Sequence, residues 1–202
     1  MSQTVSLDLL KKALPLRRFT VSDYHRMIEV GILTEDERIE LMDGVILKMN
    51  PKRTRHSVVT NLITARFYRL VPEGEALLRG QDPILLTDNT EPEPDVVVVK
   101  PREDAYLSAH PSPSDVFLVI EVSDTTLEFD KGVKLPRYAA SGIPEVWIVN
   151  LVDDRIEVYR DPIKLPDGTG IYRTRADLVK GDTLISHALL SLKIAVDEIL
   201  IS

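Results

Sequence analysis

The sequence contains no cysteine, and this absence excludes several kinds of site at once. Disulfide bridges, thiolate zinc sites and cysteine nucleophiles cannot form, and nothing argues for an oxidising compartment. Histidine is scarce as well: four residues are scattered along the chain, with none paired at helical spacing. A histidine-rich zinc site is therefore not expected.

Long apolar runs are also missing. No run approaches the roughly 20 residues that a membrane-spanning helix needs. Residues 1–16 lack the charged start, apolar middle and small-residue cleavage site of a signal peptide. We therefore expect a cytoplasmic protein without a membrane partner.

The length of 202 residues and the 44% hydrophobic content suit one sizeable core, so we expect a single domain over residues 1–202. The net charge of -7 counts against a protein whose whole surface binds nucleic acid. Charge is nevertheless uneven, because no acidic residue lies between Asp43 and Glu73.

That acid-free segment is rich in basic residues, which are Lys48, Lys52, Arg53, Arg55, Arg66 and Arg69. Such a segment could face phosphates, and Lys52, Arg53 and Arg55 are the candidates for contact with a nucleic-acid backbone. The alternative is a solvated helix face with its approach loop.

The N-terminal half shows three local signals. Residues 20–31 predict a short helix that has a threonine or serine cap and a glycine stop. Residues 39–49 predict a β-hairpin around Asp43-Gly44, a dipeptide that accepts the positive φ of a tight turn. Apolar residues recur with helical spacing over residues 56–70, ahead of Pro72, and predict the first long helix.

Later segments alternate between predicted strands and helices. Strands are expected over residues 76–79, 84–87, 96–99, 116–122 and 145–149, a helix over 131–141, a hairpin from 155–159 with its turn at 166–170, and a mixed strand and short helix at 192–200. Two of these strands, 96–99 and 116–122, are apolar without alternation, as central strands covered on both faces are. This order predicts an α/β (α+β) fold with a mixed sheet and helices on its faces.

Two carboxylates lie in strongly apolar surroundings. Asp95 opens one predicted central strand, and Glu121 lies near the end of the next. A carboxylate in such a context must be paired, protonated or metal-bound, because burying an isolated charge costs several kcal/mol even after relaxation. Two of them at neighbouring strand ends suggest a hard divalent cation such as Mg²⁺. The alternative is that Asp95 caps a turn after Pro94 and that Glu121 pairs with a basic residue.

The same features resemble the PD-(D/E)XK nuclease superfamily and, more closely, the Uma-two family of restriction-endonuclease-like domains. The fragments that carry the resemblance are residues 39–44, 56–57, 93–95 and 118–123, Asp130 with Lys134 and Tyr138, and residues 142–149. It implies a restriction-endonuclease-like mixed central sheet flanked by helices, with an N-terminal helix and a β-hairpin added. It further implies Mg²⁺ or Mn²⁺ held by Asp95, Glu121 and the backbone carbonyl of Val122.

One position departs from the superfamily pattern. Its Glu-x-Lys tripeptide would place a lysine at position 123, where this chain has Ser123. The resemblance points to Lys134 from the following helix as the replacement, with Lys131 as a second candidate. Because Pro136 is tolerated only in a helix's first turn, Lys134 is expected at the helix entrance. The alternative for Lys134 is a surface ion pair with Asp130, worth about 0.3–0.5 kcal/mol.

Two further catalytic candidates come from the resemblance. Glu40 could bind the metal or a metal-bound water, and its alternative is an exposed strand residue. His56 could bind the scissile phosphate or exchange a proton, and its alternative is a polar residue at a helix N-terminus. Tyr138 would share a helix face with Lys134, and we expect it to be a packed aromatic.

Three functions remain open from the sequence. The first is a metal-dependent endonuclease that cleaves nucleic acid, with DNA as the expected substrate. The second is a catalytically inactive binding or scaffold module, which the missing in-strand lysine and the acidic charge favour. A third is a carboxylate-based hydrolase of a small phosphorylated molecule. The superfamily often dimerises, so a homodimer is also an expectation of the resemblance.

Overall fold

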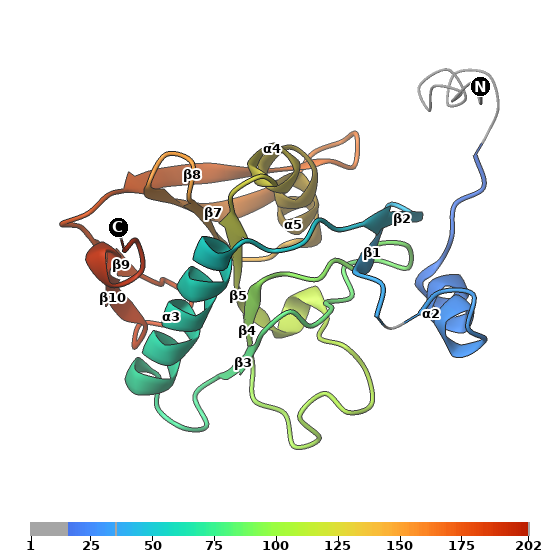
Figure 1. Ribbon diagram of the computed structural model, residues 1–202, viewed down its shortest axis with the longest axis horizontal. Coiled ribbons are helices and arrows are strands. Elements are labelled where there is room, and N and C mark those ends of the chain that lie inside the picture. Colours follow the sequence, from blue (N-terminus) through green and yellow to red (C-terminus); the bar gives the residue numbers. More distant parts are fainter. Residues whose placement is uncertain (1–15, 35, 202) are drawn as a thin grey trace. The chain divides into compact units, whose positions relative to one another are not determined.

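Six strands form the central sheet in this computed structural model, which describes residues 16–34 and 36–201. The strands are β3 (Leu77–Arg79), β4 (Val96–Val99), β5 (Val116–Ser123), β6 (Glu145–Asn150), β7 (Arg155–Lys164) and β8 (Gly170–Leu178). They are ordered β3-β4-β5-β6-β7-β8, and neighbours run antiparallel except for the parallel pair β5 and β6 (Figure 1). The predicted mixed sheet is confirmed.

Helices and short elements complete the described chain. They are α2 (Val21–Glu29), α3 (Thr54–Leu70), α4 (Leu127–Phe129), α5 (Leu135–Ser141), the small strands β1 (Ile39–Met42), β2 (Val45–Lys48), β9 (Thr183–Ile185) and β10 (Lys193–Ala195), a π-helical turn (Asp130–Lys134), and 3₁₀ turns at Pro113–Asp115 and Val196–Glu198. Within the described ranges, no helix has the length and apolar composition needed to cross a bilayer. Residues 1–15, on which the expectation of no signal peptide largely rests, lie outside the described residues.

The described residues fall into two compact units. The smaller comprises residues up to Met49 together with Asp88–Thr90, and the larger comprises Asn50–Thr87 and Glu91 onwards. The single domain over residues 1–202 therefore stays a prediction.

The smaller unit contains the predicted helix and hairpin. Thr20 caps α2 in a reciprocal arrangement, since the Asp23 amide donates to Thr20 Oγ1 and the Thr20 amide donates to Asp23 Oδ2, each at 3.0 Å. β1 and β2 pair antiparallel. Asp43 and Gly44 both have positive φ, 49° and 72°, as a two-residue hairpin turn requires.

In the larger unit, alternate side chains of the central strands face opposite sides of the sheet. Val96 belongs to a buried cluster that includes Phe67 of α3, whereas Val97 belongs to a second cluster that includes Tyr138 of α5. Because successive side chains of a strand point to opposite faces, the uninterrupted valines of β4 supply both clusters. Figure 1 shows α3 and α5 beside this sheet.

The crossover between β5 and β6 begins earlier than the helix predicted from Lys131. It starts with α4 and passes through the π-helical turn, in which the Leu135 amide donates to the Asp130 carbonyl five residues before it. Pro136 lies in the first turn of α5, directly after the π-helical turn. Residues 127–141 are helical without a break, so Lys134 lies inside the crossover helix, and the expectation that it stands at a helix entrance is wrong.

One predicted strand is wrong. Residues 84–86 are irregular, and Thr87 forms only an isolated bridge. The backbone amides of Ile84 and Leu85 donate to the carbonyls of Pro92 and Pro111, so no strand ladder forms there. Ile84 is still fully buried, and its burial accounts for the apolar pattern that resembled a strand.

Gly170 marks a close approach between β8 and α5. A Cβ at this position would lie 2.1 Å from the Ala140 nitrogen and 2.6 Å from the Ala139 carbonyl carbon. We expect Gly170→Ala to lower the free energy of unfolding by about 1–3 kcal/mol, because a packed backbone cannot move aside without strain. Urea denaturation should show this loss, whereas Gly80→Ala, whose Cβ would lie 3.9 Å from its nearest neighbour, should unfold at nearly the wild-type midpoint.

Candidate functional site

The register of β4 and β5 places Asp95 opposite Glu121. Val96 pairs with Ile120 in this antiparallel ladder, so one step outward brings residues 95 and 121 face to face. The structure agrees, since the Asp95 amide lies 3.4 Å from Glu121 Oε2 and the Val122 amide donates to Asp95 Oδ2 at 2.9 Å. The two carboxylates predicted from the sequence therefore lie side by side at one end of the central strands.

Asp95 is surrounded by donors from the start of α3 and the loop before it. His56 Nε2 lies 2.9 Å from Asp95 Oδ2, and Lys52 Nζ lies 3.1 Å from Asp95 Oδ1. Burial acts most strongly on the pKa of Asp95 and raises it, but the hydrogen bond and charge of His56, with Lys52 and the Val122 amide, outweigh burial and lower it below its usual value. Asp95 is therefore ionised at neutral pH.

Glu121 contacts the helical crossover between β5 and β6. Lys134 Nζ lies 3.2 Å from Glu121 Oε1, and the Tyr138 hydroxyl donates to the same oxygen at 2.6 Å. The two residues are four apart and reach one carboxylate oxygen from the same helical face. Tyr138 is thus packed in the core, as expected, but it also binds Glu121, a role that only its helical spacing from Lys134 hinted at.

The environment of Glu121 differs from that of Asp95. Burial raises the pKa of Glu121 to about 8, and the nearby charges of Asp130 and Asp95 add to this effect, while Lys134 and Tyr138 oppose it. Two neighbouring carboxyl groups whose pKa values are driven apart are a common feature of sites that use acid and base chemistry together. A divalent cation would relieve the crowding of acids around Glu121.

Lys131, the second lysine candidate, has another partner. Its Nζ lies 2.8 Å from Oε2 of Glu157, a fully buried carboxylate on β7. Burial raises the pKa of Glu157 most strongly, but hydrogen bonds from Lys131, Tyr159 and Asn150 lower it to about 2. Lys134, and not Lys131, is the lysine of the crossover that reaches the paired carboxylates.

The predicted nucleic-acid contacts are held by different partners. Lys52 belongs to the carboxylate cluster itself. Arg53 pairs with Asp124 at 3.3 Å but keeps 66% of its side chain exposed, and Arg55 donates to the Leu151 carbonyl at 2.8 Å. Contact of these three side chains with a phosphate backbone stays a prediction.

Glu40 lies on β1 and is buried. It belongs to the smaller unit, while Asp95 and Glu121 belong to the larger one. Its predicted role as a catalytic residue therefore stays a prediction, as does the role of the Val122 carbonyl as a metal ligand.

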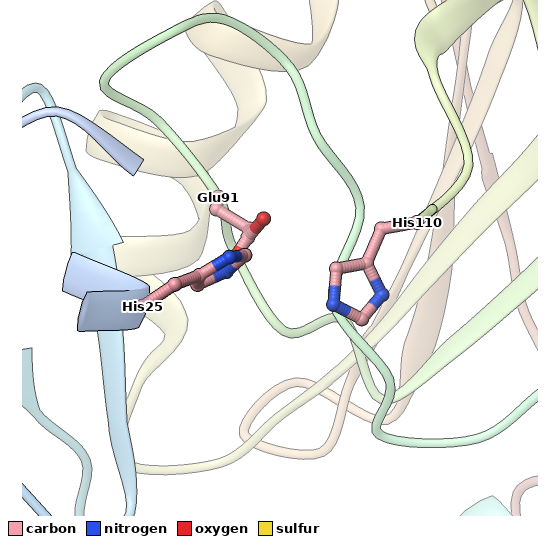
Figure 2. A group of neighbouring side chains, drawn as sticks. All are labelled: His25, Glu91 and His110. Carbon is pink, nitrogen blue, oxygen red and sulfur yellow. The ribbon is translucent and has the colours of Figure 1, made fainter. Parts of the chain in front are cut away.

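A histidine and a glutamate of the larger unit that were not among the predicted site residues also approach each other. Figure 2 shows Glu91 and His110, whose potential ligand atoms lie within 4.8 Å, and it also labels His25, which belongs to α2 of the smaller unit. Two such ligands from one unit are fewer than a protein metal site normally uses.

Comparison with known proteins identifies a family and a related fold. The model of the Uma2 family, described as "Putative restriction endonuclease", matches residues 21–197. A crystal structure described as "a putative nuclease belonging to DUF820 from Anabaena variabilis" has a TM-score of 0.66 at 15% identity, covering 90% of this chain and 97% of that one. At this identity the likeness concerns the fold alone. No curated protein matches the chain.

Proposed function

The chain belongs to the Uma2 family, and from this premise we propose that it is a metal-dependent endonuclease that cleaves the phosphodiester bonds of nucleic acid, with DNA as its substrate. One observation carries the proposal: Asp95 and Glu121 lie opposite each other with Lys134 on one carboxylate and His56 on the other. Carboxylates that can hold a divalent cation and an adjacent lysine suit the hydrolysis of a phosphodiester, because the cation and the lysine both stabilise the negative charge that develops around phosphorus.

The donor set fits a hard divalent cation. Asp95 and Glu121 offer carboxylate oxygens, and Val122 offers a backbone carbonyl, which are the ligand types that Mg²⁺ and Mn²⁺ prefer. When bound there, the ion would polarise the phosphodiester and lower the pKa of the attacking water. Because Glu121 has a raised pKa, we expect it to release a proton when it binds metal.

The chain's own residues supply orientation and charge. Lys52, His56 and the Val122 amide fix the Asp95 carboxylate from three directions. Lys134 brings a positive charge to Glu121 from a position where only 2% of its side chain is exposed. In this place it stabilises charge on the phosphate or orients the attacking water, the role that the superfamily gives to a lysine at position 123.

A cleavage assay tests this function directly. Purified protein should cut duplex DNA in Mg²⁺ or Mn²⁺ and lose this activity in EDTA, and RNA and single-stranded DNA should be assayed in parallel. Asp95→Asn keeps the side-chain shape but removes the charge, and we expect a loss of activity of roughly 10²-fold or more. Asp177→Asn, an equal change at an exposed position of β8, should cleave at the wild-type rate.

The outcomes separate the open functions. Cleavage that persists in EDTA or in Asp95→Asn would reject this site. Metal binding by calorimetry without cleavage of any nucleic acid would favour the inactive binding module. Turnover of a small phosphate ester alone would favour the third function.

A further inference from the structure

Two side chains of β5 contact the crossover from the same face of the sheet. Glu121 and Ser123 are two residues apart and therefore point to the same side. Glu121 binds Lys134, and the Ser123 hydroxyl donates to Asp130 Oδ2 at 2.7 Å. Asp130 and Lys134 are the first and last residues of the π-helical turn.

The distance between Glu121 and Ser123 along the strand matches the distance between Lys134 and Asp130 along the helix. Two residues along a strand span about 6.6 Å, and four residues along a helix span about 6 Å. Ser123 and Glu121 can therefore meet Asp130 and Lys134 at once. A change in the register of the turn would move both contacts together.

Asp130 is buried, so contact with solvent does not explain an acidic residue at this position. It is 3% exposed, and its Oδ2 accepts a second hydrogen bond, from the Thr126 hydroxyl at 2.7 Å. Its carbonyl accepts the five-residue backbone hydrogen bond from Leu135 that defines the π-helical turn. Such turns are frequent at functional sites, because they shift the register of the side chains that follow.

We propose that Ser123 and Asp130 form a clasp that positions Lys134 at Glu121, so that Asp130 acts as a positioning residue for the nuclease site. The inference rests on the function proposed above. A lysine side chain has several rotatable bonds, and holding it in one place costs conformational entropy. The clasp fixes the backbone that carries Lys134. Ser123, which stands where the superfamily has its lysine, thereby helps to position Lys134, the lysine that takes over that role.

The clasp can be tested without metal or substrate. Native protein is labelled with an amine-reactive reagent, and the rate of modification of Lys134 is followed by mass spectrometry. Asp130→Ala should raise this rate at least tenfold, since it removes two buried hydrogen bonds, those from Ser123 and Thr126, and losing one shifts such an equilibrium by about that factor. Asp130→Asn keeps an acceptor oxygen for Ser123 and Thr126 and should stay within threefold of wild type.

Ser123→Ala provides an independent route to the same result and guards against misfolding of the alanine variant of Asp130. Ser123→Ala should also expose Lys134 to the reagent. The labelling rate of the double variant Ser123→Ala/Asp130→Ala should exceed the larger single effect only slightly, because both substitutions remove the same Ser123–Asp130 hydrogen bond. Glu128→Ala, an exposed acid in α4, is the control and should change nothing. Protection of Lys134 that survives in Ser123→Ala and Asp130→Ala, or is lost equally in Asp130→Asn, would overturn the clasp.

Activity gives the second measurement. In metal-loaded enzyme, Ser123→Ala and Asp130→Ala should lower kcat roughly 10- to 100-fold and leave KM and the calorimetric Mn²⁺ affinity near wild type. Asp130→Asn should keep kcat near the wild-type value. An equal loss of Mn²⁺ binding would assign Asp130 to the metal and overturn its positioning role. If the wild-type protein cleaves no nucleic acid, the proposed function fails, while the labelling result still decides the clasp.

Discussion

Replacing Lys134 with alanine should lower kcat for nucleic-acid cleavage by roughly 10²–10³-fold, the usual effect of removing one preorganised charged donor from a reaction site. The ammonium group lies 3.2 Å from Glu121 Oε1 and is almost fully buried, so no solvent cation can take its place at low cost. Single-turnover cleavage with saturating Mn²⁺ measures the chemical step without interference from product release.

Metal binding should respond in the opposite direction. Removing a positive charge beside Glu121 takes away repulsion toward Mn²⁺, so calorimetry should give an affinity equal to or tighter than wild type. Lys164→Ala removes the same charge from an exposed position at the end of β7 and should leave both quantities unchanged. Wild-type turnover in Lys134→Ala would show that this lysine does not replace the one missing at position 123.

The central part of the fold could be predicted because its strands are dominated by burial. The apolar runs of β4 and β5 supply side chains to both faces of the sheet, and only interior strands do this. Their register could not be read from the pattern, since a run of four valines is the same on both faces. The sequence could therefore only suggest that Asp95 and Glu121 lie close together. The register of β4 and β5 is what places them opposite each other.

Other features depend on contacts distant in sequence. Residues 84–86 have the composition of a strand, but the amides of Ile84 and Leu85 donate to proline carbonyls, and no local pattern shows where a backbone amide finds its partner. The π-helical turn contains Gly132 and is followed by Pro136, two poor helix formers, but the sequence does not show that Asp130 contacts Ser123 on the neighbouring strand. Helical spacing placed Tyr138 on the face of Lys134, but it could not show that the hydroxyl reaches Glu121.

The stability of the metal-free protein should fall as pH rises toward 8, and Glu121→Gln should make this fall shallower. The folded protein holds the Glu121 proton up to a pKa of about 8, whereas an unfolded chain releases it near the usual 4.5. Between these values the folded state binds more protons than the unfolded state, so each pH unit lowers the free energy of unfolding. The slope approaches about 1.4 kcal/mol per unit, and the full span corresponds to about 5 kcal/mol.

Urea denaturation in EDTA between pH 5.5 and 8 measures this slope. The window avoids Asp95 and Glu157, whose lowered pKa values affect stability only in more acidic solution. Burial also raises the pKa of Asp130, which acts in the same direction as Glu121, so the comparison with Glu121→Gln isolates the part due to Glu121. Glutamine keeps an oxygen for the Tyr138 hydroxyl and cannot ionise, so its curve should be flatter than the wild-type curve by the contribution of this one group. Glu73→Gln, at an exposed position, should run parallel to wild type. Parallel curves for wild type and Glu121→Gln would mean that Glu121 is already ionised at neutral pH, and the two carboxylates would then not differ in protonation before a metal binds.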